Sequence, residues 1–127
     1  MPRTPVSTGG APAAIGPYSQ ATRAGDTVFL SGQIALHPDS GELAEGGIRA
    51  QARRAFANLE AVCAAAGGSL DDVVRVGLYL TDLGEFSEVN AVMAEVFAEP
   101  YPARSTIGVA ALPRGAVFEV DAVMVLR

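Results

Sequence analysis

Residues 117–126 read VFEVDAVMVL, and this stretch decides the fold prediction. Side chains of a strand point alternately to its two faces, and here both faces carry apolar residues. One face would hold Val120, Ala122 and Met124, and the other Val117, Val123 and Val125. Such a strand needs cover on both sides. Residues 27–36 repeat the pattern, with Val28, Leu30 and Ile34 opposed to Phe29.

Outward from this stretch, the chain divides into five predicted strands and two predicted helices. Turn signals and β-forming residues place the strands at residues 18–24, 27–36, 73–80, 104–110 and 117–126. Apolar residues at helical spacing predict one helix over residues 48–66, stopped by Gly67-Gly68. A second helix would be capped by Asp82 and ended by Pro100-Tyr101-Pro102. The order β-β-α-β-α-β-β predicts an α+β domain with one mixed sheet.

The length of 127 residues fits a single domain, which we expect to span residues 1–127. Residues 1–14 are rich in Pro, Gly, Ser and Thr, and we expect them to form a flexible N-terminal segment. No stretch resembles the apolar core of a signal peptide or a membrane span. Together with the lone Cys63, this predicts a cytoplasmic protein.

The two predicted helices are enough to cover only one face of the sheet. The second face would expose a large apolar patch, which usually marks a protein interface. We therefore expect a homo-oligomer that buries this face between subunits. The alternative is that the loops and the N-terminal segment cover it.

The composition excludes several kinds of chemistry. A formal net charge of −5 gives no overall attraction to nucleic acid or to an anionic membrane. The chain has no lysine, which excludes a lysine Schiff base. Cys63 stands alone, so neither an intrachain disulfide nor a cysteine metal site is possible. The only histidine, His37, lies in a stretch that is typical of a turn.

Two charged residues stand where strands are expected to be apolar. Arg104 opens the fourth strand, and its planar guanidinium can hold a carboxylate with two parallel hydrogen bonds. Strand alternation puts Glu119 on one face with Asp121, Val123 and Val125. This face is expected to be buried, and burial would raise the pKa of Glu119 and favour acid–base work. The structural alternatives are an ion pair or a solvent-exposed strand end for Arg104, and a cross-strand ion pair with an arginine for Glu119.

Three further residues are candidates for lining a ligand site. Tyr18 follows the rigid turn Ile15-Gly16-Pro17, and Ser31 precedes Gly32 inside an apolar strand. A glycine there allows a ligand or another backbone to approach closely. The structural alternatives are core packing for Tyr18 and a β-bulge at Ser31-Gly32. The basic cluster Arg49, Arg53 and Arg54 on the first helix has a solvated face as its ordinary explanation and a ligand site as the alternative.

Five segments of the chain resemble the Rid (reactive intermediate deaminase, RidA/YjgF) family in order and spacing. They are residues 14–20 (AIGPYSQ), 30–34 (LSGQI), 79–82 (YLTD), 102–105 (PARS) and 117–120 (VFEV). The likeness runs from Ala11 to the C-terminus.

The resemblance implies a chorismate-mutase-like fold and a homotrimer with three clefts between adjacent subunits. It also implies hydrolysis of 2-iminopropanoate and 2-iminobutanoate to 2-oxo acids and ammonia. Arg104 would then hold the substrate carboxylate, and Glu119 would orient water and shuttle protons. Tyr18 and Ser31 would line the cleft, and Gly32 would offer backbone contact. Imine hydrolysis needs orientation, one water and proton transfer, so we expect no metal and no cofactor.

One position departs from the family pattern. Archetypal members carry a cysteine two residues after the arginine, and here that position is Thr106, which can still offer its backbone and hydroxyl to a substrate. The departure keeps open a second interpretation, a protein that binds or senses small carboxylates in the same cleft without turnover. A third, an RNA-acting protein, is disfavoured by the acidic charge, the lack of lysine and the few aromatic residues.

Overall fold

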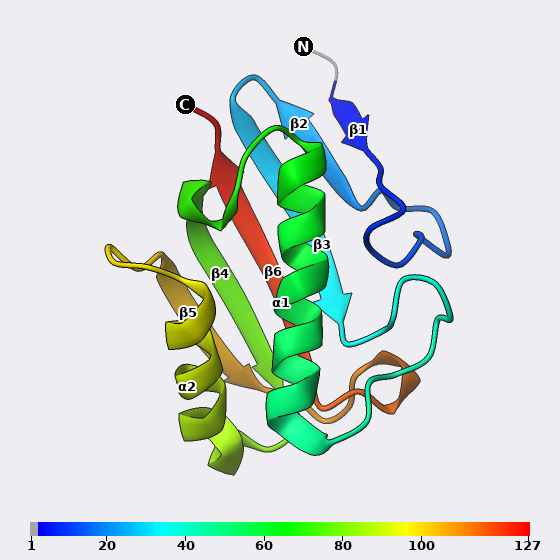
Figure 1. The fold of residues 1–127 in the computed structure, drawn as a ribbon, viewed down its shortest axis with the longest axis vertical. Coiled ribbons are helices and arrows are strands. Elements are labelled where there is room, and N and C mark those ends of the chain that lie inside the picture. The colour runs from blue at the N-terminus through cyan, green and yellow to red at the C-terminus, as the bar shows by residue number, and fades with distance from the viewer. Residues whose placement is uncertain (1–2) are drawn as a thin grey trace.

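The computed structural model describes residues 3–127. Within this range the strands are β1 (Thr4–Val6), β2 (Ala21–Ala24), β3 (Thr27–Ile34), β4 (Val73–Leu80), β5 (Ala103–Gly108) and β6 (Phe118–Val125). The α-helices are α1 (Gly47–Ala65) and α2 (Phe86–Val96), and the 3-10 turns are η1 (Leu70–Asp72), η2 (Leu83–Glu85) and η3 (Pro113–Gly115). All the strands join one sheet in the order β1-β2-β3-β6-β4-β5 (Figure 1).

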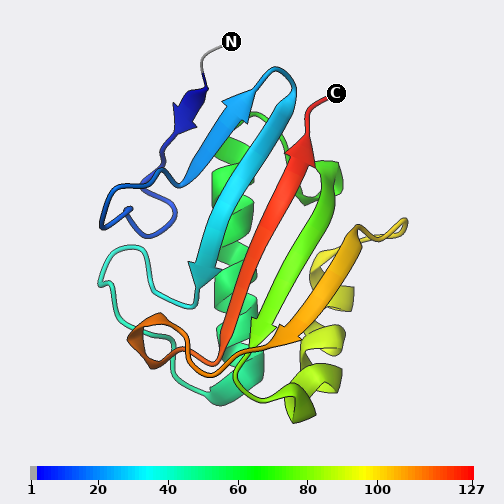
Figure 2. The same ribbon diagram turned by 180° about the vertical axis from the view of Figure 1, so that it is seen from behind.

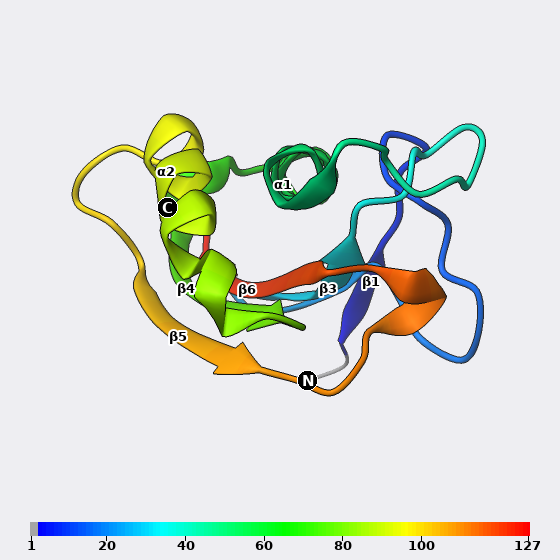
Figure 3. The ribbon, with the colours of Figure 1, turned by 90° about the horizontal axis from the view of Figure 1, so that it is seen from below.

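Strand β6 is central to the sheet, because it pairs antiparallel with β3 on one side and with β4 on the other. The edge strand β5 runs parallel to β4, so the sheet is mixed. Both helices lie against the same face (Figure 3). The predicted α+β architecture is therefore confirmed. None of the helices within residues 3–127 is long and apolar enough to cross a membrane.

The core lies between this face and the helices. Strand β6 contributes Phe118, Val120, Ala122 and Met124, all buried. Phe56 of α1 packs edge-on against Phe97, with ring centroids 5.7 Å apart, and lies 5.5 Å from the ring of Phe118. Complete burial of one such side chain stabilises the fold by about 1.5–3 kcal/mol. Cys63 is buried here as well, and desolvation, with smaller contributions from Glu60 and Asp72, raises the pKa of its thiol to about 12.

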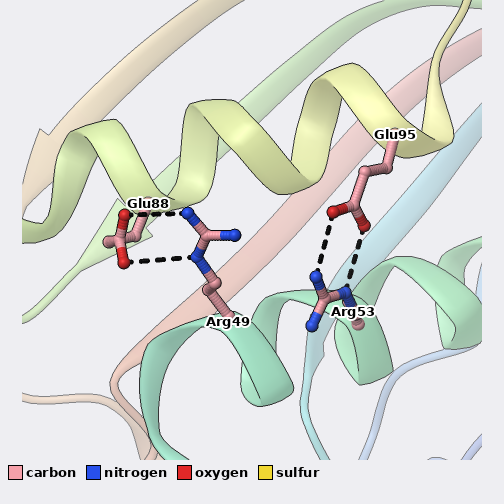
Figure 4. A network of polar contacts seen from close by, with 4 residues as sticks. All are labelled: Arg49, Arg53, Glu88 and Glu95. Carbon is pink, nitrogen blue, oxygen red and sulfur yellow. Dashed lines mark hydrogen bonds and ion pairs between the residues drawn. The ribbon is translucent and has the colours of Figure 1, made fainter.

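Two bidentate ion pairs join α1 to α2 (Figure 4). Arg49 donates from Nε and Nη2 to the carboxylate of Glu88 over 3.2 and 3.1 Å, and Arg53 makes the same fork to Glu95 over 3.1 and 2.9 Å. These bonds lower the pKa of both glutamates. Arg54 donates to Asn58 instead. Two arginines of the basic cluster therefore link α1 to α2, and the third, Arg54, bonds within α1.

Several predicted boundaries differ from the structure. The strand predicted from residue 18 begins at Ala21, because Gly16 adopts a φ of 135° and Tyr18 N donates to Gly16 O, which closes a turn. Tyr18 is thus a loop residue. Asp82 caps η2 by accepting a hydrogen bond from Gly84 N, and η2 continues into α2. The strand predicted over residues 73–80 is confirmed.

The N-terminal segment differs most from its expected form. Of the segment expected to be flexible, residues 1 and 2 lie outside the described residues, and Thr4–Val6 forms β1, paired with β2. The buried amide of Gln20 holds the next part, accepting from Thr8 N and donating to the carbonyls of Thr8, Ala11 and Pro12. A buried amide with four backbone bonds outweighs the local composition, which favours a coil.

The face away from the helices stays open in the isolated chain (Figure 2). Phe29 of β3 and Ile107 of β5 are 51% and 50% exposed there. The N-terminal segment and the loops leave both side chains uncovered, which contradicts the alternative that they cover the whole face.

We expect Gln20→Ala to destabilise the fold by about 1–3 kcal/mol, because it leaves buried backbone groups without partners. Urea unfolding at a fixed protein concentration measures this. Thr22→Ala, at a β2 residue two positions after Gln20, is the matched control, with an expected change within about 0.5 kcal/mol. Equal midpoints for Gln20→Ala and the control would show that the amide does not hold the segment.

Candidate functional site

A cavity of about 650 Å³ opens where β3 and β6 meet the N-terminal loop. Four of the residues singled out in the sequence line it: Tyr18, Ser31, Gly32 and Glu119. Apolar side chains, among them Ile15 and Leu36, make up much of the remaining wall. The cavity combines an apolar lining with a few polar groups, as small-molecule sites commonly do.

The β3 wall of the cavity is a β-bulge. The pairing of β3 with β6 shifts register between Leu30 and Gln33, which leaves Ser31 and Gly32 outside the regular ladder. The hydroxyl of Ser31 donates to Ser19 O over 2.6 Å, and its backbone N–H donates to Gln20 O. These bonds fix the loop that carries Tyr18. The bulge residues Ser31 and Gly32 thus form one wall of the cavity.

Glu119 projects from β6 on the open face and lies across Gly32. A Cβ atom built at Gly32 would overlap the Glu119 carboxylate. The backbone of Gly32 does not have a positive φ, so glycine is needed here for space and not for conformation. Any side chain at this position would displace the carboxyl group from the cavity.

The pKa of Glu119 is raised, mainly because burial desolvates its charged form and secondly because of the negative charge of Asp121. Among residues 3–127 Glu119 has no ion pair with an arginine. The cross-strand ion pair is therefore not formed. A carboxyl group with a raised pKa keeps its proton to a higher pH than an ordinary glutamate, which favours general acid–base work.

Arg104 lies elsewhere, on the side of β5 that faces α2. Its Nη1 donates to Asn90 Oδ1 over 2.6 Å, and its guanidinium carbon lies 5.1 Å from the ring centroid of Phe86. It lines a second hollow of about 440 Å³ together with Tyr101 and Pro102. Within the described residues it has no carboxylate partner, so the structural ion pair is not formed. Nη1 is occupied by Asn90, and the side chain is exposed in the isolated chain, which fits the alternative of a solvent-exposed strand end.

Thr106 lies two positions along β5, on the same side as Arg104 by strand alternation. Its hydroxyl is buried, and the part of the chain that the structure describes offers it no hydrogen-bond partner. Asn90 and Phe86, which orient Arg104 from α2, were not predicted from the sequence. Their spacing of four residues along a helix was a weak signal, since it says nothing of the strand that they would meet.

The predicted site residues thus form two groups. Tyr18, Ser31, Gly32 and Glu119 share the cavity at β3 and β6, which we call the acid half-site. Arg104 borders the hollow under α2, and Thr106 lies beside it on β5; we call this the arginine half-site. The sheet separates the two half-sites, so one chain by itself does not bring Arg104 and Glu119 together.

Comparison with known proteins gives concordant matches over the whole chain. Residues 8–126 match the family model described as Endoribonuclease L-PSP. The chain is 45% identical over 126 residues to a 2-iminobutanoate/2-iminopropanoate deaminase of Dermatophagoides farinae, which covers 99% of this chain and 98% of that protein.

Solved structures agree. RidA from the Antarctic bacterium Psychrobacter sp. PAMC 21119 is 47% identical with a TM-score of 0.94, over 97% of this chain and 99% of its own. TdcF of E. coli, solved with bound serine, is 38% identical with a TM-score of 0.93, over 98% and 99% of the two chains.

The raised pKa of Glu119 gives a testable pH dependence of stability. Between the ordinary glutamate pKa of about 4.3 and the raised pKa of the folded state, the folded chain binds more protons than the unfolded chain. The wild type therefore loses stability as pH rises through this window. We expect Glu119→Gln to be more stable than wild type at neutral pH, with the difference vanishing below about pH 4.

Urea unfolding across this pH range measures the effect. Glu45→Gln removes the same charge from an exposed loop and serves as the control. A stability gain for Glu119→Gln that is the same at every pH would contradict the assignment.

Proposed function

The chain belongs to the Endoribonuclease L-PSP family, which includes the Rid (RidA/YjgF) proteins, and we propose that it hydrolyses 2-imino acids to 2-oxo acids and ammonia. The observation that carries this proposal is the acid half-site, in which a desolvated Glu119 lies over Gly32 in an apolar cavity. The full-length likeness to a 2-iminobutanoate/2-iminopropanoate deaminase supports these two compounds as substrates.

In the proposed reaction, the Arg104 guanidinium holds the substrate carboxylate with charge-assisted hydrogen bonds. Protonated Glu119 donates its proton to the imine nitrogen. The resulting Glu119 carboxylate accepts a proton from water as the water oxygen bonds to C2 and the C=N π electrons move to nitrogen. Glu119 then protonates the amine and the C–N bond breaks, which releases ammonia. As the carbonyl forms, the Glu119 carboxylate takes up the hydroxyl proton and returns to its protonated starting state. Water is consumed and ammonia released, with no redox step.

This scheme requires two copies of the chain, because Arg104 and Glu119 lie on opposite faces of the sheet. We propose a homotrimer with a cleft at each boundary, where Arg104 of one copy meets Glu119 of the next. The exposed Phe29 and Ile107 support burial of the open face between copies. The solvent-exposed side chain of Tyr18 would then close over the substrate from the acid half-site. We place the reaction in the cytoplasm, where a lone reduced cysteine such as Cys63 is ordinary.

The main alternative is a protein that binds small carboxylates without turnover. It is favoured by Thr106, which stands where archetypal members carry cysteine and whose hydroxyl has no hydrogen-bond partner within residues 3–127. Cleavage of RNA is disfavoured, because Arg49 and Arg53 are paired with glutamates and the net charge is −5.

We expect Arg104→Ala to lower kcat/KM for imine hydrolysis by about 100-fold, which corresponds to the loss of about 3 kcal/mol of charge-assisted hydrogen bonding. An amino-acid oxidase generates the imine in situ, semicarbazide traps what remains, and faster loss of trappable imine reports turnover. Arg53→Ala, which removes an arginine from the ion pair to α2, is the matched control with unchanged turnover. No acceleration by wild type over several imines, with carboxylate binding that depends on Arg104, would establish the binding protein instead.

Mixed assemblies test the placement of the site between copies. Arg104→Ala and Glu119→Gln, each with strongly reduced activity alone, should regain activity when co-expressed. About a quarter of the clefts in a random equal mixture would carry both wild-type residues. Arg104→Ala mixed with the double variant is the control and should stay inactive. Light scattering should give about 39 kDa for three chains of 13.0 kDa. No recovery in mixed assemblies of confirmed composition would contradict a shared site.

A further inference from the structure

A second polar group lies on the open face beside Glu119, and the proposed mechanism does not use it. Across the β4–β6 ladder, Tyr79 stands opposite Glu119 and Gly77 stands opposite Asp121. The Tyr79 hydroxyl donates a hydrogen bond to Asp121 Oδ2 over 3.0 Å. The phenol therefore crosses the ladder diagonally to reach the carboxylate one pair away.

Gly77 makes this crossing possible. A Cβ atom at Gly77 would lie 2.9 Å from the Tyr79 hydroxyl and would overlap Asp121 Oδ1. Gly77 has no positive φ, so here too glycine is needed for space. The arrangement repeats on the other side of β6, where Gly32 leaves room for Glu119.

The two carboxyl groups of β6 consequently diverge. Glu119 and Asp121 are two residues apart, so both project from the same face of one strand. Glu119 leans over Gly32 on β3, and Asp121 leans over Gly77 on β4. Like charges on neighbouring positions repel, and the Tyr79 hydroxyl gives one of them a fixed partner away from the other.

We propose that Asp121 is a positioning residue for Glu119. The Tyr79 hydroxyl holds the Asp121 carboxylate on the β4 side. This leaves the space over Gly32 to Glu119 and directs the Glu119 side chain into the cavity. The inference rests on the proposed function only in taking Glu119 as the group that transfers protons.

The same geometry acts on the proton affinity of Glu119. The charged and titratable groups around it are Asp121 on β6, Tyr79 and Arg75 on β4, and Tyr18 and Arg114 in the cavity wall. Both arginines are engaged elsewhere, Arg75 with Ser105 Oγ over 3.1 Å and Arg114 with Gly41 O over 3.2 Å. Asp121 is therefore the charge that acts on Glu119, and it adds to desolvation in raising the Glu119 pKa. Desolvation and Asp121 also raise the pKa of Tyr79, which keeps its hydroxyl a donor.

The test is the titration of Glu119 itself, followed by the carbon chemical shift of its labelled carboxyl group in the full-length protein. In Asp121→Asn we expect the Glu119 midpoint to move to lower pH than in wild type. Asp71→Asn removes one negative charge from an exposed turn and should leave the midpoint in place. Asp121→Glu restores the charge and should move the midpoint back toward the wild-type value. The alkaline limb of kcat for imine hydrolysis should follow the same order of variants.

An unchanged Glu119 midpoint in folded Asp121→Asn, or an equal shift in Asp71→Asn, would overturn the proposal. Should Asp121→Asn fail to fold, Tyr79→Phe tests it by removing only the hydroxyl. That variant should lower kcat several-fold with KM within about twofold, because it disturbs position and not substrate binding. An unchanged kcat would count against the proposal. Because the titration needs no turnover, a shifted midpoint in a protein without imine hydrolysis would keep this inference and reject the proposed function.

Discussion

The constraint on which the structure depends is that a sheet has two faces and β6 makes different use of each. Even-numbered residues of β6, from Phe118 to Met124, pack into the core under the helices, and odd-numbered residues face the open side. Because β6 lies between β3 and β4, the helix side cannot be altered without losing the core. The open side is free of that demand, and it carries the carboxyl groups. Stability and chemistry are thus divided between alternate residues of one strand.

Space on the open side comes from glycine on the neighbouring strands. Gly32 and Gly77 flank β6, and each leaves room for one carboxyl group of the central strand. Burial of Glu119 next to Asp121 costs folding free energy at neutral pH, since it opposes ionisation. The aliphatic and aromatic core on the other face offsets this cost. A desolvated polar group on one face of a well-packed sheet is a common arrangement at functional sites.

The sequence was informative about the secondary-structure elements, but it did not show which side of the sheet the polar residues of different strands share. Periodicity in residues 48–66 and 117–126 identified a helix and a strand, because burial imposes that periodicity on the chain. Arg104, Glu119, Tyr18 and Ser31-Gly32 were found as polar residues in apolar surroundings. The positions of Arg104 and Glu119 on opposite faces could not be predicted in this way. They depend on the strand order, which places β6 in the centre and β5 at the edge and cannot be read from local patterns. Two sets of contacts were not predicted for the same reason, namely the bonds of Gln20 to residues 8–12 and the contact of Asn90 with Arg104. Both join different segments of the chain.

The separation of the two half-sites has a consequence for how the activity would respond to dilution. Under the proposed assembly, a solitary chain carries every chemical group that the reaction needs but holds them too far apart to cooperate. Activity would then depend on the association equilibrium between copies of the chain. Once the protein concentration drops below that at which copies associate, activity would fall faster than linearly with concentration. A newly synthesised chain would be catalytically inactive until it assembled with other copies. Catalysis would thereby report the abundance of the protein as well as its presence.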